Sequence, residues 1–206
     1  EITTRLVGSE MCIRDRVDNT YVPLDASLGI RINALPGFSI GLSGGYEICK
    51  KALFLLPEDL DGKFTGVSRF WGIDANALKA ELDVSYRYGT KLEASAKVGY
   101  HRWKTADGGE AISYNRPQWE GGVNIRYMPV RPFTLEAGYE FAAGREYSNL
   151  GKLSDIHLVH LKASYAFTSW FSLYGLTDNV LNRKYDILYG MPAQGINFMF
   201  GVDLKF

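Results

Sequence analysis

The chain has 206 residues, with 23 Lys and Arg against 23 Asp and Glu, so its formal net charge is zero. This balance gives no basis for a nucleic-acid partner, which an excess of basic residues would favour. Of the two cysteines, Cys12 lies in a segment set aside below, and Cys49 alone makes no disulfide framework. The longest apolar run, residues 52–56, is far shorter than the about 20 residues of a membrane-spanning helix. The 22 glycines and 14% aromatic residues are typical of antiparallel β proteins.

Residues 1–16 show no periodic pattern. The stretch LVGSEMCIRDR, residues 6–16, resembles the translation of a transposon-end sequencing adapter. A segment of that origin is excluded from fold reasoning. We therefore expect residues 1–16 to be an artefact or disordered, residues 17–206 to form a partial transmembrane barrel, and the true N-terminal part of the gene product to be missing.

From there on, apolar and polar residues alternate strictly in segment after segment, as in FTLEAGYEFAAG at residues 133–144. A period of two is the signature of a β-strand with two chemically different faces. The pattern predicts about nine strands of about 10–12 residues, a length that crosses a bilayer at a tilt. In chain order they cover residues 24–34, 38–48, 78–88, 91–101, 118–128, 133–144, 160–168, 170–182 and 196–206. The strand at 170–182 alternates too poorly for its faces to be assigned.

The connections alternate between short and long. The short ones, at residues 35–38, 88–91, 128–133 and 167–171, carry the Gly and Pro of tight turns. The long ones cover residues 50–77, 104–117, 145–156 and 183–195. Short turns at one end and long loops at the other are typical of an outer-membrane β-barrel, whose short turns face the periplasm.

The two predicted faces differ in charge. One is apolar along its length, and the other carries the side chains of Lys79, Glu81, Asp83, Arg87, Glu93, Lys97, Arg126, Glu136, Glu140 and Lys162. Aromatic residues gather near strand ends, as expected for two interfacial girdles. Those toward the short turns are Tyr86, Tyr88, Tyr127, Phe133, Tyr165, Phe167, Trp170 and Phe206, and those toward the long loops are Tyr100, Trp103, Trp119 and Tyr139. The sequence predicts an all-β, antiparallel up-and-down meander belonging to a transmembrane barrel, although a soluble β-sandwich also has alternating strands.

No catalytic constellation is recognisable, and we expect neither an enzyme, nor a metal site, nor a cofactor. His157 and His160 would point to opposite faces of a strand and could not chelate one metal together. The inner charges are most simply a mutually satisfied polar interior, and the alternative is a ring of charges that selects the substrate. Candidate ligand-binding residues in the long loops are Arg69, Phe70, Trp71, Tyr114 and Arg116, since aromatic and Arg side chains stack on and hydrogen-bond small ligands. The alternative is that these rings pack the loops against one another.

The last part of the chain resembles a known family. Residues 173–206 contain an Asp-Asn-hydrophobic-Leu-Asn run followed by Arg-Lys-Tyr, carried by Asp178, Asn179, Leu181, Asn182 and Tyr185. A terminal alternating strand follows, with Phe200, Val202, Leu204 and Phe206 in register. This combination is similar to the closing strands of TonB-dependent receptors, and the terminal strand is similar to the signal read by the barrel-assembly machinery.

The resemblance implies a multi-pass protein of the Gram-negative outer membrane that imports a scarce nutrient in an energy-coupled way. Such receptors have a barrel of about 22 strands around a plug, so this chain would be the last part of the barrel. The implied partners are outer-membrane lipid, the assembly machinery, an unidentified small ligand, and a TonB-type energy-coupling protein that acts through the missing N-terminal part. The alternatives are a plugless pore or structural barrel and, as the least favoured, a soluble β domain.

Overall fold

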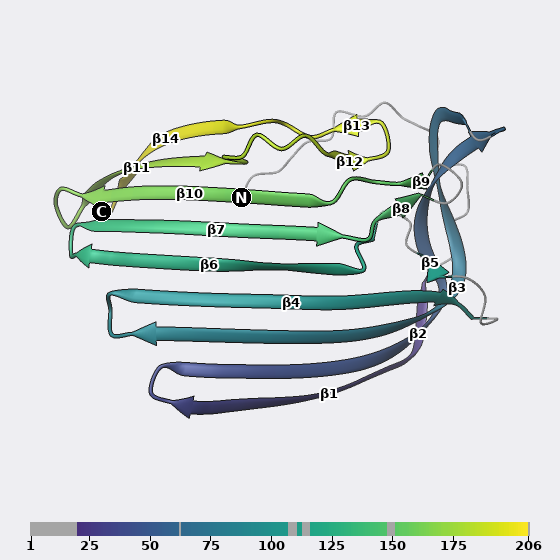
Figure 1. The fold of residues 1–206 in the computed structure, drawn as a ribbon, viewed down its shortest axis with the longest axis horizontal. Helices are drawn as coiled ribbons and strands as arrows, with labels where there is room; N and C mark the ends of the chain where they lie inside the picture. The colour runs from purple at the N-terminus through teal and green to yellow at the C-terminus, as the bar shows by residue number, and fades with distance from the viewer. Residues whose placement is uncertain (1–19, 62, 107–110, 113–115, 148–150, 206) are drawn as a thin grey trace.

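The computed structural model describes residues 20–61, 63–106, 111–112, 116–147 and 151–205. Residues 1–16 and the predicted site residue Tyr114 lie outside these ranges, as does Phe206. Nine strands form one antiparallel meander in which each strand pairs with the next (Figure 1). They are β1 (Tyr21–Leu35), β2 (Phe38–Leu60), β3 (Lys63–Tyr88), β4 (Leu92–Thr105), β6 (Trp119–Val130), β7 (Phe133–Ala143), β10 (Ile156–Ala166), β11 (Phe171–Asp178) and β14 (Asn197–Leu204).

Short strands lie within the long connections. β5 (Ala111–Ile112) pairs with β4, β8 (Glu146–Tyr147) pairs with β9 (Gly151–Lys152), and β12 (Asp186–Leu188) pairs with β13 (Met191–Pro192). All four short turns lie at one end of the sheet, and the longer connections lie at the other (Figure 1). The predicted all-β meander and the predicted asymmetry of its connections are therefore confirmed. Within the described ranges, no helix has the length and apolar character needed to cross a membrane.

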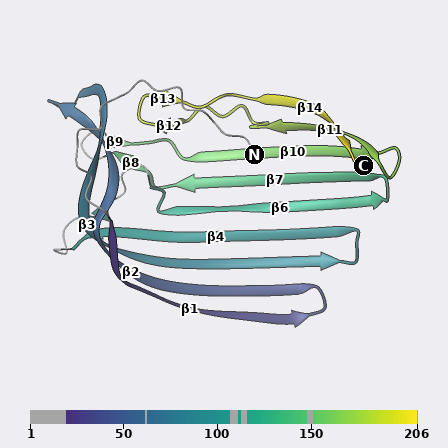
Figure 2. The same cartoon turned by 180° about the vertical axis from the view of Figure 1, so that it is seen from behind.

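The sheet is a single layer whose outward face is uncovered, as Figure 2 shows from behind. Leu28 on β1 is 79% exposed and Phe200 on β14 is 83% exposed. A sandwich would bury such side chains against a second sheet, and among the described residues no second sheet covers them. The sandwich alternative is therefore wrong. The register also shows which residues of β11 face outward, which the sequence pattern leaves open. Phe171, Leu173 and Gly175 stand opposite Leu204, Val202 and Phe200, so they share the outward face.

The predicted loop over residues 50–77 is wrong, because β2 and β3 continue through most of it. Cys49 pairs with Ala75 and the pairing resumes at Ala52 and Ile73. Lys50 and Lys51 of β2 therefore stand against the single residue Asp74 of β3, and one extra residue bulges from β2. Lys51 in this bulge has a φ of 53°, in the left-handed region. Beyond the bulge, the β2–β3 hairpin turns at a steep angle to the other strands and extends past their ends (Figure 1). The bulge shifts the two-residue period, which hides the strand from pattern reading.

Candidate functional site: the concave face and the long-loop rim

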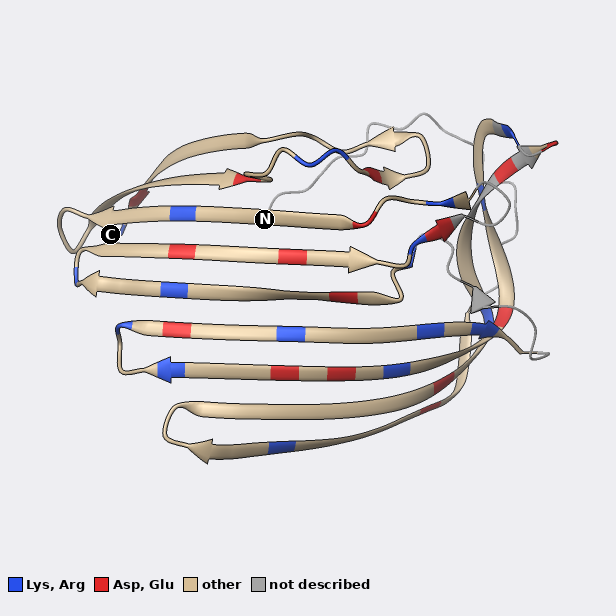
Figure 3. Ribbon diagram, viewed as in Figure 1, with Lys and Arg blue, Asp and Glu red and all other residues tan. Residues whose placement is uncertain are grey.

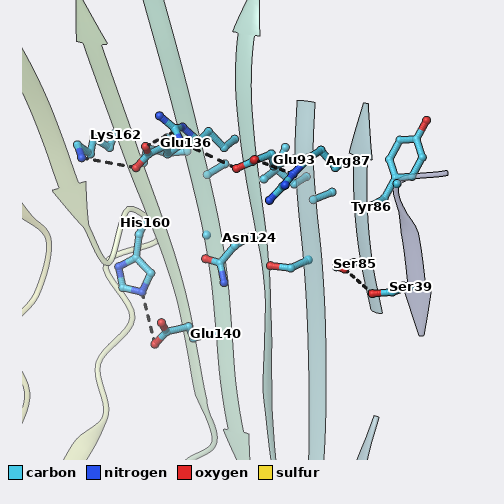
Figure 4. Close-up of a pocket in the computed structure, with 18 of the residues that line it drawn as sticks. Ser39, Ser85, Tyr86, Arg87, Glu93, Asn124, Glu136, Glu140, His160 and Lys162 are labelled. Carbon is cyan, nitrogen blue, oxygen red and sulfur yellow. Dashed lines mark hydrogen bonds and ion pairs between the residues drawn. The ribbon is translucent and has the colours of Figure 1, made fainter. Parts of the chain in front are cut away.

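A row of alternating charges crosses the inner face of five strands. Arg87, Glu93, Arg126, Glu136 and Lys162 are successive cross-strand neighbours on β3, β4, β6, β7 and β10. The N···O distances along the row are 2.9 Å, 3.9 Å, 3.5 Å and 3.6 Å. The colours alternate across the sheet in Figure 3, and the contacts are drawn in Figure 4. Opposite charges directly across a strand pair are favourable, so this part of the face satisfies its own charges.

A second polar row lies one step toward the long loops. Ser39 and Ser85 share a hydrogen bond of 2.8 Å. His160 lies 3.0 Å from an Asp178 oxygen and 3.7 Å from a Glu140 oxygen. Both rows line a hollow of about 880 Å³, which makes the charged face the concave one (Figure 4). The face predicted to carry the charges therefore forms the interior, as in a barrel with a polar lumen.

The histidines lie on both faces. His160 points inward, whereas His157 lies outward, where its ring stacks on Tyr139 and its Nδ1 is 2.8 Å from the Tyr139 hydroxyl. The prediction that His157 and His160 face opposite ways is confirmed. Across the described segments, no group of three or more His, Cys, Asp or Glu side chains is placed to hold a metal ion.

The tightest packing of the described chain lies where the β2–β3 hairpin bends. Cys49, Ala52, Phe54 and Ala75 are buried together there, with Trp103 of β4 against them. The Phe54 and Trp103 rings meet edge to face, with centroids 5.8 Å apart. Trp103 therefore faces inward, and its prediction as a member of the outer aromatic girdle is wrong.

Arg116 holds this bend in place. Its guanidinium lies 4.7 Å from the Phe54 ring centroid and 4.5 Å from that of Trp103, and it donates a hydrogen bond of 3.2 Å to the Leu53 carbonyl. Burial lowers the pKa of the Arg116 guanidinium from its usual value, and the two π faces compensate part of that desolvation. Arg116 therefore packs against aromatic side chains, as expected from the alternative in which the loop residues pack against one another.

The other described candidate residues lie on β3 rather than in a loop. Trp71 stands directly across from Phe54, so it shares the inner face of the hairpin, and Arg69 follows two positions away on that face. Arg69 lies 3.5 Å from a Glu58 oxygen. Phe70 points to the opposite face. The structure therefore groups Arg69 and Trp71 with the Phe54–Arg116 cluster and separates Phe70 from them.

Asp74, which pattern reading misses, anchors the bulge. One carboxylate oxygen accepts a hydrogen bond of 2.9 Å from the Lys51 backbone N–H, and the other lies 2.9 Å from the Lys50 ammonium. The Lys50 contact is the largest of the effects that lower the pKa of Asp74. A carboxylate held in this way fixes the bend from which the hairpin extends.

We expect the Asp74 anchor to fail in acid. Because the pKa of Asp74 is lowered in the folded chain, its stabilisation is complete above the usual carboxyl pKa of about 4. It is lost only as the pH falls through the lower folded value. Hydrogen exchange at the Lys51 amide should therefore accelerate in acid relative to the strand amides, and Asp74→Asn should accelerate it already at neutral pH. Equal protection in Asp74→Asn and the parent chain would contradict the anchor.

The Asp-Asn-hydrophobic-Leu-Asn run forms a braced turn after β11. Asn179 and Asn182 both have a left-handed backbone, with φ of 50° and 46°, which asparagine tolerates better than most residues. The Asn179 amide donates to the Arg183 and Gln194 carbonyls at 2.9 Å and 3.3 Å, and its oxygen accepts from the Arg183 N–H at 2.8 Å. Asn182 accepts from the Ile196 N–H at 3.1 Å, just before β14. Leu181 is exposed, and the Tyr185 carbonyl accepts from the Ala193 N–H at 2.9 Å. The run is thus structural.

The terminal strand has the register that the sequence predicts. Phe200, Val202 and Leu204 alternate on the outward face of β14 and are exposed there. Their use as an assembly signal stays a prediction.

No protein-family model and no curated protein matches the sequence. Solved structures of outer-membrane receptors and transporters do share its fold. The copper transporter OprC matches with a TM-score of 0.71 and 16% identity, covering 94% of this chain. The ferripyoverdine receptor FpvA of Pseudomonas aeruginosa matches with a TM-score of 0.66 and 18% identity, covering 88%.

The ferric-catecholate import receptor Fiu of E. coli K12 matches with a TM-score of 0.67 and 11% identity, again covering 88% of this chain. The chain spans only 32%, 27% and 27% of the lengths of these three structures. The predicted fold, an antiparallel meander that is part of a larger β-barrel, is confirmed.

Proposed function

We propose that this chain is the C-terminal barrel segment of a TonB-dependent receptor that takes up a scarce nutrient across the outer membrane. The observation that carries the proposal is the two-faced sheet. Its outward side is apolar and uncovered, and its concave side is charged and internally paired. A sheet of this kind needs lipid outside and water or protein inside. The fold shared with a copper transporter and two iron-complex receptors supports a role in uptake rather than in catalysis.

The proposed ligand contacts are at the long-loop rim. Arg69 and Trp71 present an exposed cation and an exposed ring on one face of the hairpin. Arg116 holds that hairpin against β4 through Phe54 and Trp103, so its part is to position the rim. Phe70 and Tyr114 remain candidates from the sequence. Energy coupling would come from a TonB-type protein that acts on an N-terminal part of the receptor.

Uptake in whole cells tests this proposal. Cells that express the full-length gene product would be fractionated, and accumulation of copper and of iron–siderophore complexes measured with and without a protonophore. We expect the product in the outer-membrane fraction and an accumulation that the protonophore abolishes. Accumulation that persists with the protonophore would favour the passive pore, and a product in the soluble fraction would overturn the membrane assignment.

Trp71 and Phe70 form a matched pair for locating the ligand. They are adjacent and equally exposed, at 58% and 59%, but lie on opposite faces of the hairpin. An aromatic contact at the centre of a binding site contributes about 2 kcal/mol or more. Trp71→Ala should therefore weaken ligand binding at least about tenfold, and Phe70→Ala should change it little. A larger effect of Phe70→Ala would place the ligand on the other face.

A further inference from the structure

Two basic side chains interrupt the apolar outward face at the long-loop end of β4. Arg102 and Lys104 lie two positions apart, so both point outward with Tyr100, and both are exposed. Their cross-strand neighbours on β3 are Leu78 and Asn76, which carry no charge. This end of β4 is blue in Figure 3.

Their surroundings differ from those of the inner cations. On the nine strands, every inward Lys and Arg side chain between the short turns and the level of Arg102 has a carboxylate partner. These cations are Arg31, Lys79, Arg87, Lys97, Arg126 and Lys162. Within the part of the chain that the structure describes, Arg102 and Lys104 have no ion pair or hydrogen bond of the side chain. The nearest carboxylate on the outward side of β3, Asp74, is held by Lys50 and Lys51. Among the described residues, the two cations therefore have no anionic partner.

The height of Arg102 on the sheet indicates where that anion lies. Directly below it, toward the short turns, Tyr100 packs against Trp119 with ring centroids 4.7 Å apart. The next outward row, with Leu82 and Val98, is apolar. Leu92 and Arg102 are ten positions apart on β4, or ~33 Å along the strand. At the usual tilt of ~40° this is ~25 Å along the membrane normal, the height of the apolar band of an outer-membrane barrel. Arg102 and Lys104 therefore lie at the outer headgroup level.

We propose that Arg102 and Lys104 bind a phosphate group carried by a lipid of the outer leaflet. The inference rests on the proposed membrane location of the chain. A guanidinium fork matches a phosphate through two parallel hydrogen bonds, and an ammonium adds a second charge. With alternate side chains ~7 Å apart, both reach one phosphorylated headgroup. The Tyr100–Trp119 pair below offers rings suited to the boundary between acyl chain and headgroup.

Binding of diphosphorylated lipid A tests the site. The full-length gene product in detergent would be titrated with lipid A in its diphosphorylated and monophosphorylated forms and with inorganic phosphate, and bound lipid counted by native mass spectrometry. The variant is Arg102→Gln with Lys104→Gln. The matched control is Lys91→Gln with Arg131→Gln, two exposed cations at the short-turn end.

The double variant at the site should bind diphosphorylated lipid A at least about tenfold more weakly than the parent, since two charge-assisted contacts are lost. The control should bind like the parent. Equal binding by the parent and the site variant, or an equal loss in the control, would overturn the inference. If inorganic phosphate competes with the same affinity, the site recognises phosphate alone, and the inference that a lipid carries the phosphate is overturned. If the product is absent from the outer-membrane fraction, the proposed function fails first. If the product is present there but the site variant and the control variant bind lipid A equally, only the proposed lipid site fails.

Discussion

Replacing Ala96 with arginine is expected to lower the free energy of unfolding in a lipid bilayer by about 2–4 kcal/mol. Ala96 lies near the middle of β4 on the outward face, between Val84 of β3 and Val123 of β6. An arginine there must place its guanidinium in hydrocarbon or distort the bilayer to reach water. The measurement is reversible denaturant unfolding of the full-length gene product in vesicles.

Ser95→Arg is the matched control for this substitution. Ser95 is adjacent and similarly small, but it faces inward, between Ser85 and Asn124. An arginine on that side stays in a polar, hydrated environment, so its effect should be within about 0.5 kcal/mol. Equal costs at positions 95 and 96 would mean that lipid does not cover the outward face, and would contradict the proposed location.

Replacing Asn179 with alanine is expected to cost about 2–5 kcal/mol of stability. Asn179 is only 4% exposed, and alanine would lose its three side-chain hydrogen bonds while keeping a left-handed backbone. The backbone costs about 1–2 kcal/mol for a residue other than glycine or asparagine, and the unpaired polar groups about 1–3 kcal/mol. Denaturant unfolding in vesicles measures the total.

Two further variants separate these contributions. Asn179→Gly keeps the backbone conformation without the steric penalty, so it should be about 1 kcal/mol more stable than Asn179→Ala. Leu181→Ala, in the same turn but 53% exposed, should change the stability by less than about 0.5 kcal/mol. If Asn179→Ala resembles Leu181→Ala, the turn does not brace the end of the sheet.

How well the sequence predicts this fold depends on whether the two-residue period is interrupted. Residues 78–88 alternate without a break, and they form part of β3 with the predicted faces. The period slips at the bulge around Lys51, and the sequence therefore predicts a loop where the strand continues. Similarly, the predicted strand at 170–182 ends early, at Asp178, because Asn179 adopts a left-handed backbone.

The rim can be predicted only in part. Aromatic and Arg residues mark the right region, but the role of Arg116 depends on Phe54 and Trp103, which the sequence alone does not bring into contact with it. Only the three-dimensional packing places these three side chains together. Phe70 and Trp71 look equivalent in sequence, and the bulge hides the strand that separates their faces. Arg102 and Lys104 lie just past the predicted strand at residues 91–101, and only the observed continuation of β4 to Thr105 places them on the outward face.

The length of the apolar outward face also limits the membrane thickness that suits this sheet. The apolar outward face of β4 begins at Leu92 and ends below Arg102. In a thicker bilayer the outer cations would be drawn into hydrocarbon, and this hydrophobic mismatch costs fractions of a kcal/mol per Å. The bacterial outer membrane is thinner than average. At the proposed location, the distance from Leu92 to Arg102 would therefore penalise residence in any thicker membrane of the cell.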